Sequence, residues 1–404
     1  MSQAFNLSQF ANKVNLSGQA DLTTAVTGTL PQGNGGTGLT TPGTSGNVLM
    51  SDGTNWVSGT IYPMRNRIIN GAMVIDQRNA GASITPSSDT YTVDRWKYES
   101  SIASKFTIQQ NKGSITPPAG FSNYLGFTTA SAVSVGSGDY FLCEQYIEGF
   151  NCADLGWGTA NAKTVTLSFL VYSSLTGTFG ANLQNGANGR YYPFGYTISS
   201  ANTWTQISIT IPGDTSGTWA TGNTAGILLR FNLGAGSTYL GTPNVWGSTV
   251  YVGVTGQTNV VGTLNANWYV TGVQLEQGST ATPFERRLYN QELANCQRYY
   301  YRFGGDATYQ MFGSGVASST TNVYVGLVNP VPMRAAPTTL DYSALSNLEV
   351  FNSAHYVITG IGFDMPATNI TAIFVTASGL TQNGAYRLIA ANTTSARLGI
   401  GAEL

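Results

Sequence analysis

The sequence predicts a mainly β protein: an N-terminal stalk, a jelly-roll-like β-sandwich, a short linking helix and a C-terminal β-sandwich. The first observation behind this prediction is that apolar and polar residues alternate with a period of two in many short runs, which Gly, Asn, Asp and Pro separate. The second is that Asp, Glu, Lys and Arg make up only 9% of the chain, against roughly 25% in ordinary globular domains. At 404 residues, a chain of two or three folded units is expected at roughly 150 residues each.

Residues 1–64 are poor in apolar side chains and rich in Gly, Thr, Asn and Ser. Such a segment cannot bury a globular core by itself. It is either a flexible linker or a narrow stalk in which several copies of the chain wrap around one another. In a stalk, the sparse apolar residues would meet at the shared axis, so the candidate contacts between copies are Leu30, Val48, Leu49 and Trp56.

Residues 65–280 have the pattern of a β-sandwich, with enough strands for two packed sheets. The clearest run is 164–171, in which Val165, Leu167, Phe169 and Val171 share one face. Further strands are predicted at residues 91–96, 206–211, 227–233, 250–254 and 268–275. No helical period interrupts these runs.

The linking segment 281–303 contains the one strong helix signal. Thr282 can act as N-cap, Pro283 suits the first helical position, and Glu285 stands where a capping box places a carboxylate. The helix is expected over residues 283–302. Along it, side chains spaced by 4, 3 and 4 residues form a narrow stripe, which lines either a contact between domains or a seam between subunits: Tyr289, Leu293, Cys296 and Tyr300.

Residues 304–404 return to strand alternation and predict a smaller β domain. The alternating residues are Val323, Val325 and Leu327, then Tyr356 and Ile358, then Ile370, Ala372 and Phe374, then Tyr386, Leu388 and Ala390. Three prolines between residues 329 and 338 indicate a loop or an edge there.

Charge and composition exclude several classes of function. The formal net charge is -1, with 18 basic and 19 acidic residues, so no long-range field would attract nucleic acid. Three cysteines without a CxxC spacing and a single histidine, His355, support neither a disulfide framework nor a metal site, and no cofactor is expected. Residues 1–16 do not have the pattern of a secretory signal, and no apolar run is long enough for a membrane span.

Catalytic residues were sought among the carboxylates, because glycoside hydrolysis needs an acidic pair. The densest acidic group comprises Asp139, Glu144, Glu148 and Asp154. Solvated or locally paired carboxylates are the more ordinary explanation of such a group, and a lone histidine is more often structural than a base. No catalytic residue is therefore assigned, and we expect that the protein is not an enzyme.

Aromatic residues on loops are the candidates for binding a neutral glycan, since sugars present apolar C–H faces beside hydroxyl groups. Each of them could equally pack in a core. The candidates are Trp157, Trp204, Trp219, Trp246, Tyr309 and Tyr356.

Several motifs, considered together, resemble those of phage tail-fibre proteins. LPQGNGGTG at residues 30–38, followed by GNVLMSDGTNW at 46–56, is similar to the glycine-rich repeat of that family. NRIINGAM at 66–73, TVDRW at 92–96, VQLE at 273–276, TPFE at 282–285 and CQRYY at 296–300 extend the resemblance. The glycine-rich repeat occurs once, which implies a short fibre.

The resemblance implies an elongated homotrimeric fibre in the virion, assembled in the host cytoplasm. Its N-terminus would attach to other phage tail or baseplate proteins, and its distal end would mediate adhesion by binding a bacterial surface glycan or an outer-membrane receptor. A tailspike-like glycan depolymerase is the alternative from the enzyme class. A bacterial cell-surface lectin is a third possibility, against which the missing signal and anchor argue.

Overall fold

The computed structural model describes residues 64–404 throughout and, before them, residues 11, 14, 29–32, 36–43, 45, 47–51 and 54–60. It divides into two units, Met1–Arg65 and Asn66–Leu404. In the first unit, strands β1 (Asn47–Ser51) and β2 (Trp56–Thr60) pair antiparallel, from Asn47 opposite Thr60 to Ser51 opposite Trp56. This hairpin is the part of the expected stalk in which backbone pairing is described.

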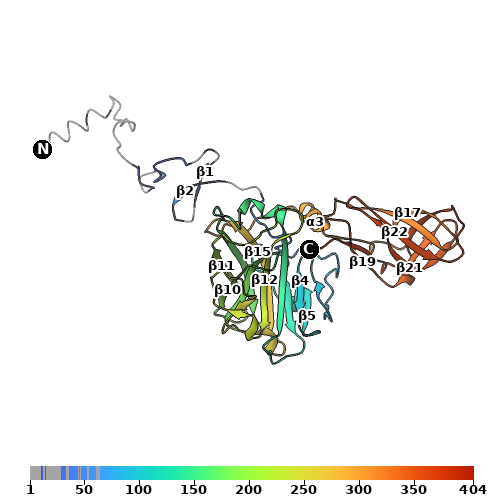
Figure 1. Ribbon diagram of the computed structural model, residues 1–404, viewed down its shortest axis with the longest axis horizontal. Helices are drawn as coiled ribbons and strands as arrows, with labels where there is room; N and C mark the ends of the chain where they lie inside the picture. Colours follow the sequence, from blue (N-terminus) through green and yellow to red (C-terminus); the bar gives the residue numbers. More distant parts are fainter. Residues whose placement is uncertain are drawn as a thin grey trace. The chain divides into compact units, whose positions relative to one another are not determined.

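The second unit begins with a β-sandwich, as predicted, in which β4, β5, β10, β11, β12 and β15 are labelled in Figure 1. The six-stranded sheet has the order β10-β9-β12-β7-β4-β3, and the five-stranded sheet has the order β11-β8-β15-β6-β5. Both sheets are antiparallel throughout.

The strands of the six-stranded sheet are β3 (Thr90–Tyr91), β4 (Lys97–Ser100), β7 (Tyr140–Glu148), β9 (Gly177–Asn185), β10 (Tyr191–Ile198) and β12 (Ala225–Ala235). Those of the five-stranded sheet are β5 (Phe106–Gln110), β6 (Leu125–Thr129), β8 (Val165–Ser173), β11 (Thr205–Ile211) and β15 (Asn267–Gln277). Two short parallel strands, β13 (Leu240–Gly241) and β14 (Gly253–Val254), lie between β12 and β15 in the chain. Single 3-10 turns occur at Lys112–Ser114, Gly149–Asn151, Ala153–Leu155, Ser237–Tyr239, Val260–Gly262 and Leu345–Asn347.

The core between the two sheets is rich in aromatic side chains. Trp96 and Trp268 are fully buried, and Phe231 lies 5.3 Å from Trp268 between ring centroids. The indole N–H of Trp268 on β15 donates to the hydroxyl of Tyr196 on β10 at 2.9 Å, so one hydrogen bond joins the two sheets inside the core. A buried indole that has a partner avoids the cost of an unsatisfied donor.

Strict alternation predicted the sandwich strands well, with two exceptions. The runs at 164–171, 206–211, 227–233 and 268–275 are confirmed as parts of β8, β11, β12 and β15. The strand predicted at 91–96 is wrong, because only Tyr91 belongs to a strand and the following residues form a turn with Arg95 at φ 71°. The strand predicted at 250–254 is reduced to Gly253–Val254. Both runs alternate because buried turns and loops also carry apolar side chains.

The linking helix is shorter than predicted, and the predicted capping box is wrong. Helix α3 spans Tyr289–Gln297, and its N-cap residue is Leu288, which makes no side-chain cap. The hydroxyl of Thr282 donates instead to Glu276 at 2.6 Å. The carboxylate of Glu285 accepts the backbone N–H of Asn66. Tertiary partners on neighbouring segments therefore replace the local cap, and the chain stays extended up to Leu288.

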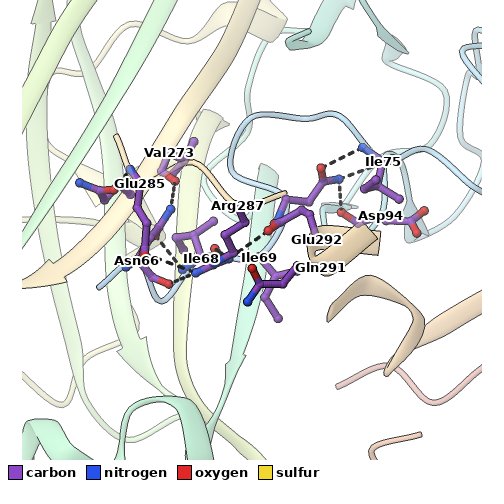
Figure 2. Close-up of polar contacts among 12 residues, drawn as sticks. Asn66, Ile68, Ile69, Ile75, Asp94, Val273, Glu285, Arg287, Gln291 and Glu292 are labelled. Carbon is purple, nitrogen blue, oxygen red and sulfur yellow. Dashed lines mark hydrogen bonds and ion pairs between the residues drawn. The ribbon is translucent and has the colours of Figure 1, made fainter. Parts of the chain in front are cut away.

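A network of hydrogen bonds, shown in Figure 2, ties the start of the second unit to strand β15. The side-chain oxygen of Asn66 accepts the N–H groups of Ile68 at 2.9 Å and of Leu275 at 3.1 Å. Its amide N–H donates to the carbonyl of Val273 at 3.1 Å. Asn66 thus bonds residues 273–275 of β15 beyond the part of that strand that pairs with β6. These hydrogen bonds explain how a strongly polar side chain can be buried.

The same network reaches helix α3 through Arg287 and Glu292 (Figure 2). Arg287 donates to the carbonyl of Ile68 at 3.1 Å and to the carboxylate of Glu292 at 3.2 Å. Glu292 in turn accepts the backbone N–H of Asn70. The motif residues at 66–73 and 282–300 therefore hold the fold together.

The C-terminal part differs from the predicted β-sandwich, because most of its strands close into a barrel. The barrel order is β17 (Met311–Ala317), β18 (Asn322–Val328), β22 (Ile370–Ala377), β21 (His355–Pro366), β20 (Leu348–Phe351) and β23 (Ala385–Ala390). In a separate sheet, β16 (Tyr300–Phe303) precedes the barrel in the chain, β24 (Leu398–Gly401) follows it, and β19 (Thr339–Tyr342) lies between the barrel strands β18 and β20. Closure removes the free edges that an open sheet of the same short strands would leave.

The predicted alternation in the barrel is confirmed. On one strand, β22, the residues predicted to share the buried face are not the buried ones. Val323, Val325 and Leu327 point into the barrel and are buried, as are Tyr386, Leu388 and Ala390. On β22 it is Ile373 and Val375 that are buried, whereas Ile370 and Phe374 are 54% and 37% exposed. Hydrophobic side chains therefore occupy both faces of β22.

The end of the chain is fixed to the sandwich by buried charges, which we call the C-terminal junction: Arg78, Arg95, Glu403, Tyr299 and Tyr300. Glu403 pairs with Arg95 and, at 3.0 Å, with Arg78. The guanidinium of Arg95 lies 3.6 Å from the ring centre of Tyr299, and that of Arg78 lies 3.6 Å from that of Tyr300. The Arg95 side chain is 1% exposed, so its charge depends on this carboxylate.

Replacing Glu403 by Gln should lower the free energy of unfolding by about 3 kcal/mol, because it removes the carboxylate that forms ion pairs with both Arg78 and the fully buried Arg95. Urea unfolding followed by fluorescence measures the change. The control is Asp89→Asn, which removes a 47% exposed partner of Lys97 and should cost less than about 1 kcal/mol. Equal effects of the two variants would contradict a stabilising role of the junction.

Candidate functional site

Three of the predicted glycan-binding tryptophans lie together at one end of the sandwich. The ring centres of Trp157 and Trp219 are 4.7 Å apart, and Trp246 lies 5.5 and 5.6 Å from them. Each indole N–H donates to a backbone carbonyl within the chain. Trp157 is buried at 7% exposure and presents no ring face to a ligand, whereas Trp219 and Trp246 are half-buried. Packing of loops accounts for this tryptophan cluster.

The other three candidates make ring contacts with other residues: Trp204 with Tyr124, Tyr309 with His355 and Tyr356 with Tyr386. Trp204 is half-buried, lies 5.5 Å from Tyr124, and donates to the carbonyl of Thr116. Tyr356 is half-buried in the C-terminal barrel, whereas Tyr309 is 47% exposed. The six candidates therefore form no common site, and their roles in glycan binding remain predictions.

The predicted subunit contacts fall into exposed and buried groups. In the N-terminal hairpin, Val48, Leu49 and Trp56 are 38%, 49% and 44% exposed. Leu30, which precedes the hairpin in the chain, is half-buried. These side chains are available to a second copy of the chain.

The stripe on the linking segment is divided in the same way. Tyr289 is 64% exposed and Leu293 is half-buried, but Cys296 and Tyr300 are 1% and 2% exposed. Cys296 and Tyr300 pack inside the second unit, Tyr300 against Arg78 of the sandwich. For these two residues, burial favours the contact between domains over the seam between subunits.

The four carboxylates suspected of catalysis are separately engaged. Asp139 accepts the N–H of Gly136 at 2.7 Å, Glu144 pairs with Arg230 at 2.7 Å, Glu148 pairs with Arg298 at 2.6 Å, and Asp154 pairs with Arg67 at 2.7 Å. Each has its own cationic or backbone partner. Nothing in this arrangement makes two of them an acid and base pair.

A row of charged residues crosses the outer face of the six-stranded sheet and was missed in the sequence. Strand register places Lys97 on β4 beside Glu144 on β7, and Glu144 beside Arg230 on β12. Glu99, two residues along β4, lies 3.8 Å from Lys97 and 3.5 Å from Arg230. We call these four residues the charged row. The alternation on each strand assigns them to the outer face, but only the strand order brings them together.

The charged row perturbs one of its own carboxyl groups. Burial, and next the charge of Glu144, raise the pKa of Glu99 from 4.5 to about 7. Glu144 is fully buried and has one side-chain oxygen without a hydrogen bond among the described residues. Glu99 and Glu144 share Lys97 and Arg230 as partners, but they differ in exposure. The side chain of Glu99 is 20% exposed, whereas Glu144 is fully buried.

The outer wall of the C-terminal barrel carries the most conspicuous exposed apolar surface. Val316 on β17, Tyr324 on β18 and Phe374 on β22 are direct cross-strand neighbours and are 52%, 43% and 37% exposed. We call these three residues the wall row. Beside it, the ring of Phe374 lies over Gly362 of β21, where a Cβ atom would come within 2.6 Å. A larger residue at this position would have to displace the ring of Phe374.

Exposed apolar side chains are concentrated in this part of the chain. Among the described residues, ten large hydrophobic side chains are exposed in residues 304–404, against six in residues 66–303, a segment more than twice as long. Contiguous exposed apolar surface marks a site of interaction more often than scattered residues do. The barrel wall is therefore the candidate binding surface.

Neither a metal centre nor a membrane-spanning helix occurs in the part of the chain that the structure describes. Its residues contain no group of three or more His, Cys, Asp and Glu side chains that could hold a metal ion. None of its helices is long and apolar enough to cross a membrane.

Comparison with known proteins yields similarity of fold. No protein-family model and no curated protein matches the chain. Among solved structures, the enzymatically active domain of tailspike protein 4 of bacteriophage CBA120 is 12% identical over 55% of this chain and 23% of that chain, with a TM-score of 0.28. TmCBM61 in complex with β-1,4-galactotriose is 8% identical over 53% of this chain and 99% of its own, with a TM-score of 0.28. A family 11 carbohydrate-binding module from Clostridium thermocellum, in complex with a β-1,3-1,4-mixed-linked tetrasaccharide, is 11% identical over 50% and 99%, with a TM-score of 0.26. No function follows from similarities at this level.

Stability should depend on pH through Glu99. Because its pKa is raised in the folded chain, the neutral form is favoured, and stability falls as pH rises from 4.5 to about 7. Glu99→Gln keeps a neutral side chain, so the variant should match the wild type at pH 4 and exceed it at pH 8 by on the order of 2 kcal/mol. Urea unfolding of both proteins at the two pH values tests this. A difference between the proteins that does not change with pH would contradict it.

Proposed function

We propose that the chain is a subunit of a phage tail fibre, a homotrimeric adhesin without catalytic activity that attaches the virion to bacterial surface glycan. The observation that carries the adhesive role is the wall row, in which Val316, Tyr324 and Phe374 lie side by side on the surface. The motifs at residues 30–56 and 66–96 support the tail-fibre assignment, since they resemble that family.

The chemistry of the wall suits a sugar. Aromatic rings stack on the C–H faces of pyranose rings, and neighbouring hydroxyl and amide groups bond the sugar hydroxyls. Asn322 and Thr376, which are half-buried and lie beside the wall row on β18 and β22, already bond each other at 3.2 Å. They offer such polar groups at the rim.

A trimer is supported by the exposed face of the N-terminal hairpin. A two-stranded hairpin alone is marginally stable in water, and this one exposes Val48, Leu49 and Trp56. Association of three copies would cover these side chains and would multiply weak glycan contacts into avidity. We propose that the same end attaches to other phage tail or baseplate proteins, and that the fibre is assembled in the host cytoplasm, where its three buried free cysteines would stay reduced.

Loss of the wall row should abolish adhesion. The double variant Tyr324→Ser with Phe374→Ser removes two exposed rings, so labelled protein should bind at least tenfold more weakly to cells that the wild type labels in a panel of bacterial strains. Flow cytometry measures the binding. The control is Thr359→Ser on β21, an exposed residue outside the row. Undiminished labelling by the double variant, or no labelling of any strain by the wild type, would count against the proposed surface.

Light scattering on the purified chain should give three times the mass of one chain. Trp56→Ser should shift the equilibrium toward the monomer, because it removes the largest exposed apolar side chain of the hairpin. Thr54→Ala, in the same turn of the hairpin, serves as the control. A wild-type chain that stays monomeric at micromolar concentration would overturn the trimer.

A glycan depolymerase is the second candidate, and the charged row favours it, because Glu99 and Glu144 there share Lys97 and Arg230 as partners. Glu99 has a pKa raised to about 7 beside Glu144, which is a property of catalytic acids. Against it, Glu144 is fully buried, and a catalytic base must touch its substrate. We therefore expect no new reducing ends when the protein is incubated with the polysaccharide that it binds. Release of reducing ends that Glu99→Gln abolishes would establish the enzyme instead.

A further inference from the structure

A groove of about 640 Å³ opens on the outside of the C-terminal barrel, away from the wall row except for Val316. It lies between β17, β20 and β23, and the turn from β20 to β21 covers one end. Its lining includes Ser314, Phe351, Asn352, Ser353 and Arg387. A cavity of this size accommodates a small ligand of one or two sugar rings.

Arg387 is the charged residue of the groove. Strand register places it directly between Phe351 on β20 and Ser314 on β17. Its guanidinium lies 5.7 Å from the ring centre of Phe351. Arg387 is exposed, and among the described residues its guanidinium takes part in no ion pair and no hydrogen bond.

The carboxylate on the neighbouring strand is already engaged. Glu349, two residues before Phe351 on β20, is hydrogen-bonded to the Nδ1 atom of His355 at 2.5 Å and forms an ion pair with it when His355 is protonated. The ring of His355 lies 4.7 Å from that of Phe351, and Tyr309 lies 5.5 Å from His355. The groove therefore combines a positive charge without a counter-ion with a series of adjoining aromatic rings.

The polar groups at the rim are held in place by the turn. The side-chain oxygen of Asn352 accepts the N–H of Ala354 at 3.2 Å, so the amide of Asn352 is oriented by the backbone. Ser314 and Ser353 add exposed hydroxyl groups on either side of the groove. Oriented donors and acceptors beside an apolar ring are the groups that fix a saccharide in one pose.

We propose that this groove binds an acidic saccharide, one whose ring carries a carboxylate or phosphate group, and this proposal rests on the proposed adhesive function. The sugar stacks its C–H face on Phe351, and its anionic group receives a forked pair of hydrogen bonds from Arg387. Asn352, Ser353 and Ser314 bond the hydroxyl groups. The barrel then has two cooperating surfaces: the wall row, which contacts neutral sugar faces, and the groove, which selects for charge.

The test measures binding of the full-length protein to a printed panel of purified bacterial capsular and lipopolysaccharide glycans. The panel includes members with uronic acids, members with phosphate groups and neutral members. We expect binding to acidic members that weakens as salt is raised, with the carboxylate and phosphate arms identifying the anion. Reduction of the carboxyl groups, or removal of the phosphate, should abolish binding to the respective member.

The variants separate charge from stacking. Arg387→Gln and Phe351→Ala should each lower the affinity for acidic members at least tenfold, and Arg387→Lys should lose most of the affinity because lysine lacks the planar fork. The matched control is Arg286→Gln, since Arg286 is also exposed and also lies over an aromatic ring, that of Phe121 at 4.7 Å. Unchanged thermal unfolding of each variant shows that the fold is retained.

The outcomes distinguish this inference from the function on which it rests. Binding of acidic glycans that Arg387→Gln does not weaken, or binding of neutral glycans alone, would overturn the groove as an acidic-saccharide site and leave the adhesin intact. Binding to no glycan on the panel would overturn both.

Discussion

The buried carboxylate of Glu403 is the constraint on which the arrangement of the second unit depends. It stands one residue from the end of the sequence and neutralises Arg78 and Arg95, which belong to the first turns of the sandwich. Arginines so little exposed are tolerable only with a partner, because removing a charge from water is costly. Strand β24, which ends two residues before Glu403, is thereby fixed between β16 and β19. The barrel is inserted between β16 and β24, so both of its connections are held at the C-terminal junction while its walls stay free.

The sequence was most informative where backbone pairing and burial act on the same residues. Strands β8 and β11 follow strict alternation, and their apolar faces lie in the core. The predicted capping box at Thr282 is wrong because tertiary contacts engage both of its side chains. The hydroxyl of Thr282 bonds Glu276 on β15, and the carboxylate of Glu285 accepts the N–H of Asn66, which is distant in sequence. The turn at residues 92–96 alternates like a strand, but Trp96 donates to the carbonyl of Asn70 and is buried as part of a loop. Local patterns cannot reveal such long-range partners.

The candidate sites were less predictable for the same reason. Composition identified aromatic residues as candidates, yet it could not separate Trp157, which is buried, from Tyr309, which is exposed. The charged row and the groove depend on strand order, since β4, β7 and β12 are neighbours in space although long segments separate them in sequence. The one clue to the charged row in the sequence is the alternation of each strand. Glu99, Glu144 and Arg230 each occupy positions opposite to the core-facing residues of their strands.

Strand β22 has apolar side chains on both faces, and the closed barrel allows the outward-facing ones to be exposed. A strand with apolar side chains on both faces usually invites aggregation, above all at the edge of an open sheet. In a closed barrel every strand has two hydrogen-bonded neighbours, so Phe374 can be exposed without also exposing unpaired backbone groups. Closure thus allows a weakly charged surface to be adhesive through side chains alone. Selectivity must then come from features of limited extent, such as an arginine beside a phenylalanine, because apolar contact by itself distinguishes poorly between one sugar face and another.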